Sequence, residues 1–416
     1  METGLYTFED GVKELGPVAF STMLKAAGSA CNLDCQYCYY LDKAQQYGGK
    51  QARMSEAMLE EYVKQYIEAN AVDTVTFCWH GGEPTLLGVD YYRKAIEFQK
   101  KYAKGKKIEN TLQTNATRID PEWCAFFRRN KFLVGVSLDG PQDIHDRFRT
   151  DKGGRPTWAR VMRSVKMMSD AGVEFNTLST VNSLCAGRGA EVYEFLKSVG
   201  SHYMQFLPVV EHVVNKPGFH RPFIVAPSYE GARLAEWSIG AREYGEFLID
   251  IFRKWVVADI GEYYVQMFDA TLAQYVGVRP GVCSMLETCG DALVVEHNGD
   301  VYNCDHFVYP EYKLGNIMET SLAEIYKSPR RSEFGLAKRR SLPAECMNCS
   351  FYFACRGECP KHRFDRNPDG TAKNSLCEGL KAYFEFTKPY MERMRDLLYR
   401  EMPPSLVMSW ARTQIK

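Results

Sequence analysis

Short apolar runs alternate with amphipathic segments along the first half of the chain. Six apolar, β-prone runs predict strands at 17–24, 72–79, 108–113, 132–138, 173–181 and 202–209. Apolar side chains at helical spacing predict helices at 58–67 (after an N-cap at Ser55), 91–102, 121–130, 158–171 and 190–199. Repeated strand–helix units predict a parallel sheet, either doubly wound or a partial barrel, with its ligand site at the carboxyl ends of the strands.

The pattern changes after residue 210. Residues 211–240 contain three prolines and indicate an irregular insertion or linker, whereas apolar spacing predicts helix over 241–276. Short segments punctuated by glycine and cysteine follow up to residue 377, and a region of this kind takes its folding energy from bound metal centres more than from a large core. We therefore expect an α/β domain at 17–240, a helical linker at 241–280, a cysteine-rich domain at 281–380 and a helical tail at 381–416.

Charge and cysteine content narrow the class of protein. The 416 residues include 52 basic and 52 acidic side chains, so bulk charge gives no reason to expect a nucleic-acid or membrane partner. The N-terminus lacks the apolar core of a secretory signal, and no apolar run is long enough to span a bilayer, which predicts a cytoplasmic protein. Fourteen cysteines in a reducing compartment indicate metal or cluster binding, because disulfides are rare there.

Three cysteines directly follow the first predicted strand. Cys31, Cys35 and Cys38 supply three thiolates without an obvious fourth, which leaves one metal position open for chemistry. Their spacing, and Tyr37 before the third cysteine, resemble the radical S-adenosylmethionine (radical SAM) superfamily. That resemblance implies a partial (β/α)6 barrel and a four-iron four-sulfur cluster that reductively cleaves S-adenosylmethionine. The resulting 5′-deoxyadenosyl radical abstracts a hydrogen from the substrate.

Further residues at the predicted strand ends extend the resemblance. A Gly-Gly-Glu-Pro segment at 81–84 follows the second strand, where paired glycines allow close backbone approach to a ligand, although such a pair is more often an ordinary turn. A structural role explains Ser137 and Arg149, the polar residues at or after the end of a later strand, equally well. The resemblance implies that the following residues contact S-adenosylmethionine: Tyr37, Gly82, Ser137, Arg149 and Leu207.

The C-terminal cysteines fit two four-iron clusters or two zinc sites, and spacing does not decide between them. They are Cys283, Cys289, Cys304, Cys346, Cys349, Cys355, Cys359 and Cys377. Their order resembles the auxiliary-cluster domain known as SPASM, which makes three four-iron clusters in all. By that resemblance, Cys283, Cys289, Cys304 and Cys359 hold the first auxiliary cluster. Cys346, Cys349, Cys355 and Cys377 hold the second.

The amino-acid sequence around these cysteines carries a more specific family resemblance. Residues 288–290, 295–306 and 358–364 resemble the anaerobic sulfatase-maturating enzymes. This resemblance implies oxidation of a cysteine or serine in an unfolded sulfatase to Cα-formylglycine, with electrons from a donor such as flavodoxin or ferredoxin. It also implies that an auxiliary cluster takes the second electron from the substrate.

The same resemblance makes Asp305 the base that removes the substrate proton, with His306 and His80 as rival bases. An ordinary loop carboxylate is the plain alternative for Asp305, and a carboxylate shielded beside a cluster has a perturbed pKa. We place His80 and Tyr40 near the substrate.

Two alternatives remain open at the level of sequence. Another peptide-modifying radical enzyme, which forms thioethers or crosslinks, would share both domains, but such enzymes usually carry an additional N-terminal recognition domain. A non-catalytic scaffold with structural zinc sites is the alternative from a different class, and the three-thiolate motif argues against it. The sequence does not distinguish cysteine from serine substrates, name the electron donor, fix the oligomeric state or say which auxiliary cluster takes the electron.

Overall fold

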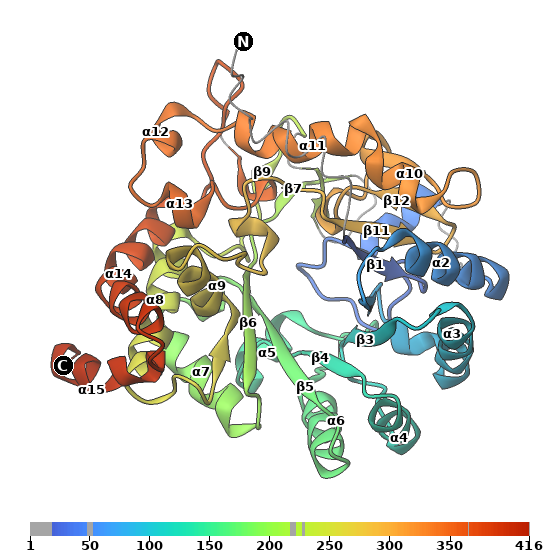
Figure 1. Cartoon of the computed structure of the whole chain (residues 1–416), viewed down its shortest axis with the longest axis horizontal. Coiled ribbons are helices and arrows are strands. Elements are labelled where there is room, and N and C mark those ends of the chain that lie inside the picture. The colour runs from blue at the N-terminus through green and yellow to red at the C-terminus, as the bar shows by residue number, and fades with distance from the viewer. Residues whose placement is uncertain (1–18, 48–52, 217–221, 227–228, 365, 416) are drawn as a thin grey trace. The chain divides into compact units, whose positions relative to one another are not determined.

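The computed structural model describes residues 19–47, 53–216, 222–226, 229–364 and 366–415, and it divides into two compact units (Figure 1). The first unit comprises residues 1–30, 43–112 and 289–337, and the second comprises residues 31–42, 113–288 and 338–416. Each unit thus combines segments that lie far apart in the sequence. The predicted boundaries at 240, 280 and 380 stay predictions, and residues 17 and 18 of the first predicted strand lie outside the described residues.

A mixed sheet forms the first unit. Its strands are β1 (Ser21–Lys25), β2 (Thr74–Trp79), β3 (Lys107–Thr114), β11 (Ala292–Glu296), β12 (Asp300–Tyr302) and β13 (Lys313–Asn316). They lie in the order β3-β2-β1-β11-β12-β13, parallel from β3 to β11 and antiparallel beyond. Helices α2 (Glu56–Ala69), α3 (Val89–Tyr102) and α10 (Leu322–Lys327) belong to the same unit. The Ser55 cap is confirmed.

The second unit contains a parallel sheet in the order β4-β5-β6-β10. Its strands are β4 (Leu133–Ser137), β5 (Phe175–Val181), β6 (Tyr203–Pro208) and β10 (Tyr264–Val265). Its first helices are α4 (Pro121–Arg129), α5 (Gln142–Phe148), α6 (Trp158–Asp170) and α7 (Gly189–Ser198). These strand–helix repeats confirm the predicted pattern, with α5 as an unpredicted addition.

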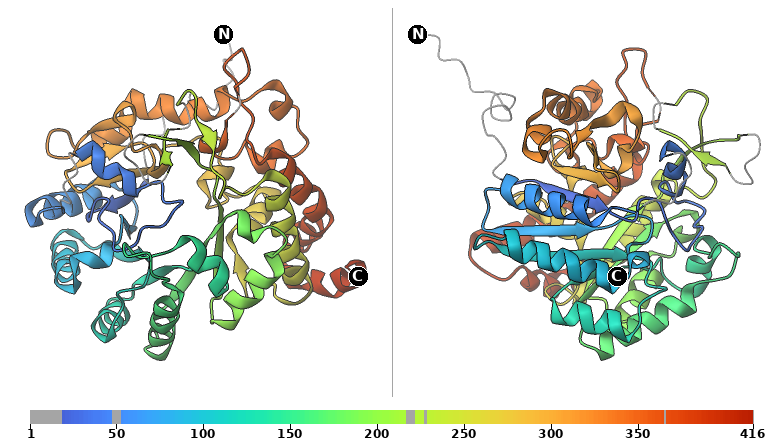
Figure 2. Two further views of the ribbon diagram at one scale, coloured as in Figure 1. Left: turned by 180° about the vertical axis from the view of Figure 1, so that it is seen from behind. Right: turned by 90° about the vertical axis from the view of Figure 1, so that its right-hand side faces the viewer.

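Helices dominate the rest of the second unit. They are α8 (Ala241–Ala258), α9 (Gln266–Tyr275), α12 (Ala344–Met347), α13 (Tyr352–Cys355), α14 (Cys377–Tyr399) and α15 (Val407–Gln414), while α11 (Pro329–Arg340) crosses the boundary between units. Helix α14 lies alongside α8 in Figure 1 and in the rear view of Figure 2. A Cβ at Gly379 of α14 would overlap the carbonyl group of Ala241, so glycine is needed for this close approach.

Two segments differ from the sequence prediction. The region 211–240 is not wholly irregular, because β7 (His212–Val214), β8 (Phe223–Ile224) and β9 (Arg233–Leu234) form a small antiparallel sheet. The helical region 241–276 is broken around Gly261, where φ is 92° and the chain enters β10. Within the described residues, no helix has both the length and the apolar content needed to cross a membrane.

Candidate active site

The loop that carries Cys31, Cys35 and Cys38 is held by the segment after α5. The backbone N–H of Asp34 donates to the Thr150 carbonyl at 2.9 Å, and that of Gln36 donates to the Phe148 carbonyl at 3.1 Å. Cys35 is buried, whereas the other two cysteines are partly exposed. One loop therefore presents three thiols from a fixed backbone.

The three thiols oppose one another's ionisation. Burial raises the pKa of Cys35 far above its usual range, and although Arg149 lowers it, Cys38 and Cys31 raise it further. Deprotonating all three thiols together requires a strongly positive group among them, and binding to a metal centre deprotonates a thiol outright. This donor set therefore fits an iron–sulfur cluster held by Cys31, Cys35 and Cys38.

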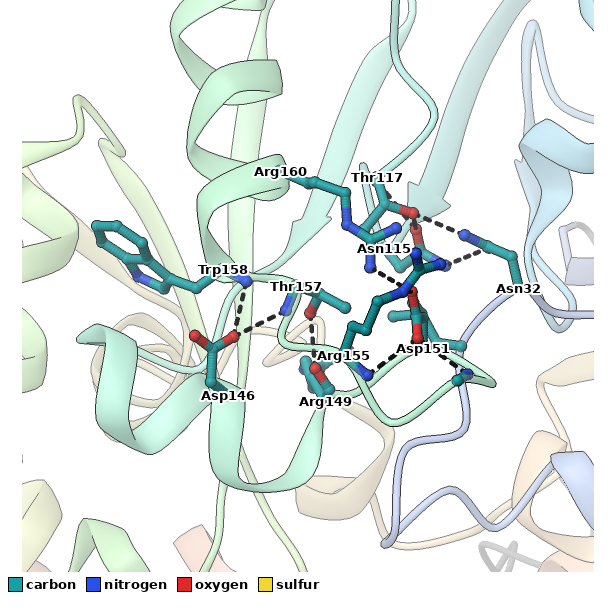
Figure 3. Close-up of polar contacts among 12 residues, drawn as sticks. Asn32, Asn115, Thr117, Asp146, Arg149, Asp151, Arg155, Thr157, Trp158 and Arg160 are labelled. Atoms are coloured by element: carbon teal, nitrogen blue, oxygen red, sulfur yellow. Dashed lines mark hydrogen bonds and ion pairs between the residues drawn. The ribbon is translucent and has the colours of Figure 1, made fainter.

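A polar network supports the Cys31 end of this loop (Figure 3). The Asn115 side-chain amide donates to Cys31 Sγ at 3.7 Å and to Asn32 Oδ1 at 3.0 Å. Asn32 Nδ2 in turn donates to Thr117 Oγ1 at 2.8 Å. Sequence analysis missed Asn115, although it directly follows β3, and its position at the carboxyl end of a parallel strand was the available signal.

Tyr37 and Arg149 meet at a buried carboxylate. The Tyr37 hydroxyl donates to Asp139, and Arg149 donates through Nε and Nη2 to the two Asp139 oxygens at 2.9 and 3.0 Å. Burial alone would raise the pKa of Asp139, but Arg149 outweighs it and holds the pKa below its usual value. The Thr157 hydroxyl donates to the Arg149 carbonyl at 2.7 Å (Figure 3). Arg149 is thus anchored internally, and its contact with S-adenosylmethionine stays a prediction.

Two other predicted contacts lie at the carboxyl ends of β4 and β6, the parallel strands on either side of β5. Ser137 ends β4, and its hydroxyl accepts a hydrogen bond from Gln113 Nε2 at 3.1 Å. Leu207 lies one residue before the end of β6 and remains 40% exposed. The parallel order β4-β5-β6 places both residues at the same edge of the sheet, where α/β folds bind ligands.

In the first unit, the turn after β2 supports the chain that leads into Cys31. The backbone N–H of Gly82 donates to the Gly28 carbonyl at 2.8 Å, and that of Glu83 donates to the Ala30 carbonyl at 2.7 Å. A Cβ at Gly82 would overlap the Ala30 carbonyl group. Glycine at this position therefore has a structural purpose in addition to the predicted cofactor contact, which stays a prediction.

Three polar side chains converge elsewhere in the first unit. Lys25, the last residue of β1, is fully buried, and its Nζ lies 2.5 Å from Asp305 Oδ1 and 3.1 Å from His80 Nδ1. The Gly81 backbone N–H also donates to His80 Nδ1, at 2.9 Å. An ammonium and an amide N–H only donate, so Nδ1 is the acceptor and the proton of neutral His80 is on Nε2. Sequence analysis missed Lys25, because only tertiary contacts reveal its role.

The two titratable groups beside Lys25, Asp305 and His80, both have lowered pKa values but differ in charge. Burial alone would raise the pKa of Asp305, but Lys25, His80 and His306 lower it below its ordinary value. Burial, together with the Lys25 charge, lowers the pKa of His80 to about 4. Near neutral pH, Asp305 is therefore an ionised acceptor and His80 a neutral donor, which favours Asp305 over His80 as a base. Tyr40 is buried in the second unit, so its position near the substrate stays a prediction.

The second predicted auxiliary set lies entirely in the second unit. Burial, with a contribution from Cys377, raises the pKa of Cys346 to about 11. Burial raises the pKa of Cys355 to about 12, with contributions from Glu358, Cys377 and Cys346. Cys349 also raises the pKa of Cys377, after burial. This mutual effect is what four thiols around one cluster produce.

The first predicted set is divided between the units. Cys289 and Cys304 belong to the first, and Cys283 and Cys359 belong to the second, so this grouping stays a prediction. Buried Lys338 donates to the carbonyls of Cys283 at 3.2 Å and Ser284 at 2.7 Å, and so holds the Cys283 loop. Across the described ranges, no three histidine, cysteine or carboxylate side chains converge tightly enough to hold a single metal ion.

Comparisons with known proteins agree with this site. Residues 27–189 match the family model of the radical SAM superfamily, and residues 283–350 match that of an iron–sulfur cluster-binding domain, SPASM. A solved structure described as native anSMEcpe with bound AdoMet is 31% identical, with a TM-score of 0.79 over 90% of this chain and 99% of that one. Fold and site together define a radical SAM enzyme with the predicted partial barrel and SPASM domain.

The relatives identify the family within that class. A serine-type anaerobic sulfatase-maturating enzyme of Bacteroides thetaiotaomicron is 45% identical over 93% of this chain and 94% of the relative. A cysteine-type enzyme of Clostridium novyi is 33% identical over 88% of this chain and 95% of the relative. The chain therefore belongs to the family of anaerobic sulfatase-maturating enzymes. The scaffold alternative is set aside.

Proposed function

We propose that this enzyme oxidises a serine in an unfolded sulfatase polypeptide to Cα-formylglycine. The observation that carries the proposal is the 45% identity, over nearly the full length of both chains, with an enzyme described as serine-type. Two further serine-type relatives, from Klebsiella aerogenes and Klebsiella pneumoniae, are 35% and 34% identical. Cysteine is the second candidate substrate, because cysteine-type relatives are 31 to 33% identical.

In this proposal, the chain holds three four-iron clusters and S-adenosylmethionine. Cys31, Cys35 and Cys38 hold the first cluster, and the eight C-terminal cysteines hold the auxiliary pair in the predicted sets. When bound, the first cluster and S-adenosylmethionine supply the 5′-deoxyadenosyl radical that takes one hydrogen from the substrate Cβ. Tyr37, Gly82, Ser137, Arg149 and Leu207 orient S-adenosylmethionine for that step.

The chain's own acid–base chemistry centres on Asp305. Converting a hydroxymethyl side chain into an aldehyde removes two hydrogens, one from carbon and one from oxygen. Asp305 accepts the second as a proton, and an auxiliary cluster, when bound, would accept the remaining electron. The ionised carboxylate, held at 2.5 Å from the Lys25 ammonium, supports this assignment.

The proposed partners follow from the same chemistry. A peptide segment must reach the site, and a related structure is described as anSMEcpe with bound AdoMet and Cp18Cys peptide. A reducing protein such as flavodoxin or ferredoxin supplies the electron that starts the reaction. We place the enzyme in the cytoplasm, where reducing conditions preserve free thiols.

Mass spectrometry of a peptide substrate tests the proposal. Anaerobically reconstituted enzyme is incubated with S-adenosylmethionine, reductant and a peptide bearing Ser-x-Pro-x-Arg, alongside a matched Cys-x-Pro-x-Arg peptide. We expect loss of two hydrogens from the serine peptide and formation of an aldehyde that a hydrazide probe captures. Oxidation of the cysteine peptide alone would make the enzyme cysteine-type, and oxidation of neither would contradict the proposal. A Cys31→Ala/Cys35→Ala/Cys38→Ala variant is the inactive control.

A further inference from the structure

The Lys25 ammonium lies in an environment that a structural lysine rarely occupies. Its side chain has no exposure to solvent, and withdrawing an ammonium from water is costly unless charged and polar partners replace the lost hydration. Two of those partners are Asp305, at 2.5 Å, and His80, at 3.1 Å. The resemblance to the family places both residues at the substrate.

Contacts with Lys25 leave Asp305 as a hydrogen-bond acceptor and His80 as a hydrogen-bond donor. The Lys25–Asp305 ion pair fixes the position of Oδ1 of Asp305, and a carboxylate oxygen accepts hydrogen bonds. The Lys25 N–H, together with the Gly81 amide, occupies His80 Nδ1 and leaves the ring proton on Nε2 as a donor. One side chain thus organises an acceptor and a donor.

A serine hydroxyl needs this combination. The hydroxyl donates its proton to an acceptor, and its oxygen accepts a hydrogen bond from a donor, which orients the O–H bond. A thiol makes weaker use of the donor, because sulfur is a poor hydrogen-bond acceptor. The pair of groups fixed by Lys25 therefore matches an alcohol better than a thiol.

We infer that Lys25 is a positioning residue for the oxidation, holding Asp305 and His80 as the acceptor and donor for the substrate hydroxyl. This inference rests on the proposed function. It differs from a purely structural ion pair in one respect that can be measured. An ion pair that serves the fold alone can be replaced by apolar residues without loss of activity. Substituting a positioning residue does lower activity, and this effect disappears when the residue that it positions is also substituted.

A double-mutant cycle tests the inference in the reconstituted holoenzyme. It compares wild type, Lys25→Met, Asp305→Asn and the double variant for kcat, KM, formylglycine formed per 5′-deoxyadenosine, iron content and Tm. Methionine preserves length and removes the charge. Lys106→Met is the control, because Lys106 is a partly buried lysine whose Nζ donates to backbone carbonyls, those of Ile67 and Asn70 at the end of α2.

We expect Lys25→Met to lower kcat about 100-fold, the loss that a displacement of about 1 Å produces, with KM and iron content close to wild type. The double variant should be no slower than Asp305→Asn alone. The Tm of Lys25→Met should fall below that of Lys106→Met, because the partly buried Asp305 carboxylate then lacks its ammonium partner, and adding Asp305→Asn should restore it. The Lys25→Met loss should also be larger for the serine peptide than for the cysteine peptide.

Specific outcomes would overturn the inference. Independent, multiplicative losses of kcat in the double variant would show that Lys25 does not act through Asp305, and so would an unchanged product ratio in Lys25→Met. If wild type oxidises neither peptide, the proposed function fails, and the Tm cycle still reports whether Lys25 and Asp305 are coupled. Should Lys25→Met not accumulate as holoenzyme, Lys25→Arg keeps the charge, and it should restore Tm while kcat stays well below wild type.

Discussion

At the scale of single residues, the central question is which side chain takes the proton from the substrate. Three candidates lie near one another in sequence or space: Asp305, His306 and His80. His80 holds its ring proton on Nε2 and has a pKa of about 4, so it is a poor base in this environment. The lowered pKa of Asp305 keeps its carboxylate ionised near neutral pH, and the residue directly follows a predicted cluster ligand.

Asp305→Asn should separate radical formation from product formation. Asparagine keeps the size of aspartate but accepts no proton, and a general base contributes about 100- to 10,000-fold, so formylglycine yield should fall within that range. Cleavage of S-adenosylmethionine should fall much less, because it depends on Cys31, Cys35 and Cys38. The measurement is 5′-deoxyadenosine formed per aldehyde, with iron quantified on the same sample.

A matched control exists in the same unit. Asp300 is buried and, like Asp305, pairs with a lysine, Lys313 at 2.6 Å, but it is the first residue of β12. Asp300→Asn should leave the ratio at its wild-type value. If Asp305→Asn did the same, Asp305 would be removed from the catalytic residues and His306 would become the leading candidate.

At the scale of elements, the turn after β2 links two parts of the predicted cofactor site. Its backbone donates to the Gly28 and Ala30 carbonyls, so it fixes the segment that enters the Cys31 loop. The residues of this turn were predicted from their Gly-Gly pair, but no sequence pattern indicated that the turn supports the preceding loop. The contact became visible only when β1 and β2 were seen as neighbouring parallel strands.

Gly82→Ala should therefore impair cleavage of S-adenosylmethionine. The added Cβ overlaps the Ala30 carbonyl group, and overpacking of this kind costs about 1–3 kcal/mol, or about 5- to 150-fold in rate if the strain falls on the cofactor site. Gly153→Ala is the control, because a Cβ there meets nothing nearer than 3.3 Å. We expect 5′-deoxyadenosine formation to fall in Gly82→Ala and to persist in Gly153→Ala. Equal rates in the two variants would refute the steric argument.

The predicted elements show where sequence patterns suffice. Strands β2 to β6 were found within about three residues of their observed bounds, because each is a short segment with β-branched or aromatic residues between predicted helices. Helix α5 was missed because seven residues give too few turns for a periodic pattern. The short strands of 211–240 were missed because two or three residues carry no readable alternation.

In the candidate site, as in the elements, local sequence patterns predicted some residues and missed others. Cysteine spacing and the Gly-Gly pair are local signals, and they located the cluster loop and the turn directly. Lys25 and Asn115 depend on contacts with residues 280 and 84 positions away in the chain, Asp305 and Cys31. A pattern within a short window carries no information about such partners, so these two residues emerged only from the folded chain.

At the scale of the whole molecule, the second unit contains one segment that depends on bound metal for its folding and another that does not. In the second unit, Cys346, Cys349, Cys355 and Cys377 lie in short helices and turns between residues 344 and 377. Burial and neighbouring thiols raise the pKa values of Cys346, Cys355 and Cys377, so without metal these three thiols stay protonated. Helix α14 begins at Cys377 and packs along α8 through Gly379, a contact that needs no iron.

Removal of iron should therefore open a limited part of the chain. After anaerobic chelation we expect proteases to cut preferentially between residues 340 and 376, while α14 stays folded against α8 and residues 53–216 stay protected. Binding of a cluster is folding free energy for a segment with few apolar contacts of its own, so its loss exposes that segment first. Mass spectrometry of the fragments locates the cuts, and protein carried through the same steps without chelator is the control. Equal resistance with and without iron, or first cuts within 53–216, would show that the cysteine-rich segment folds without its metal.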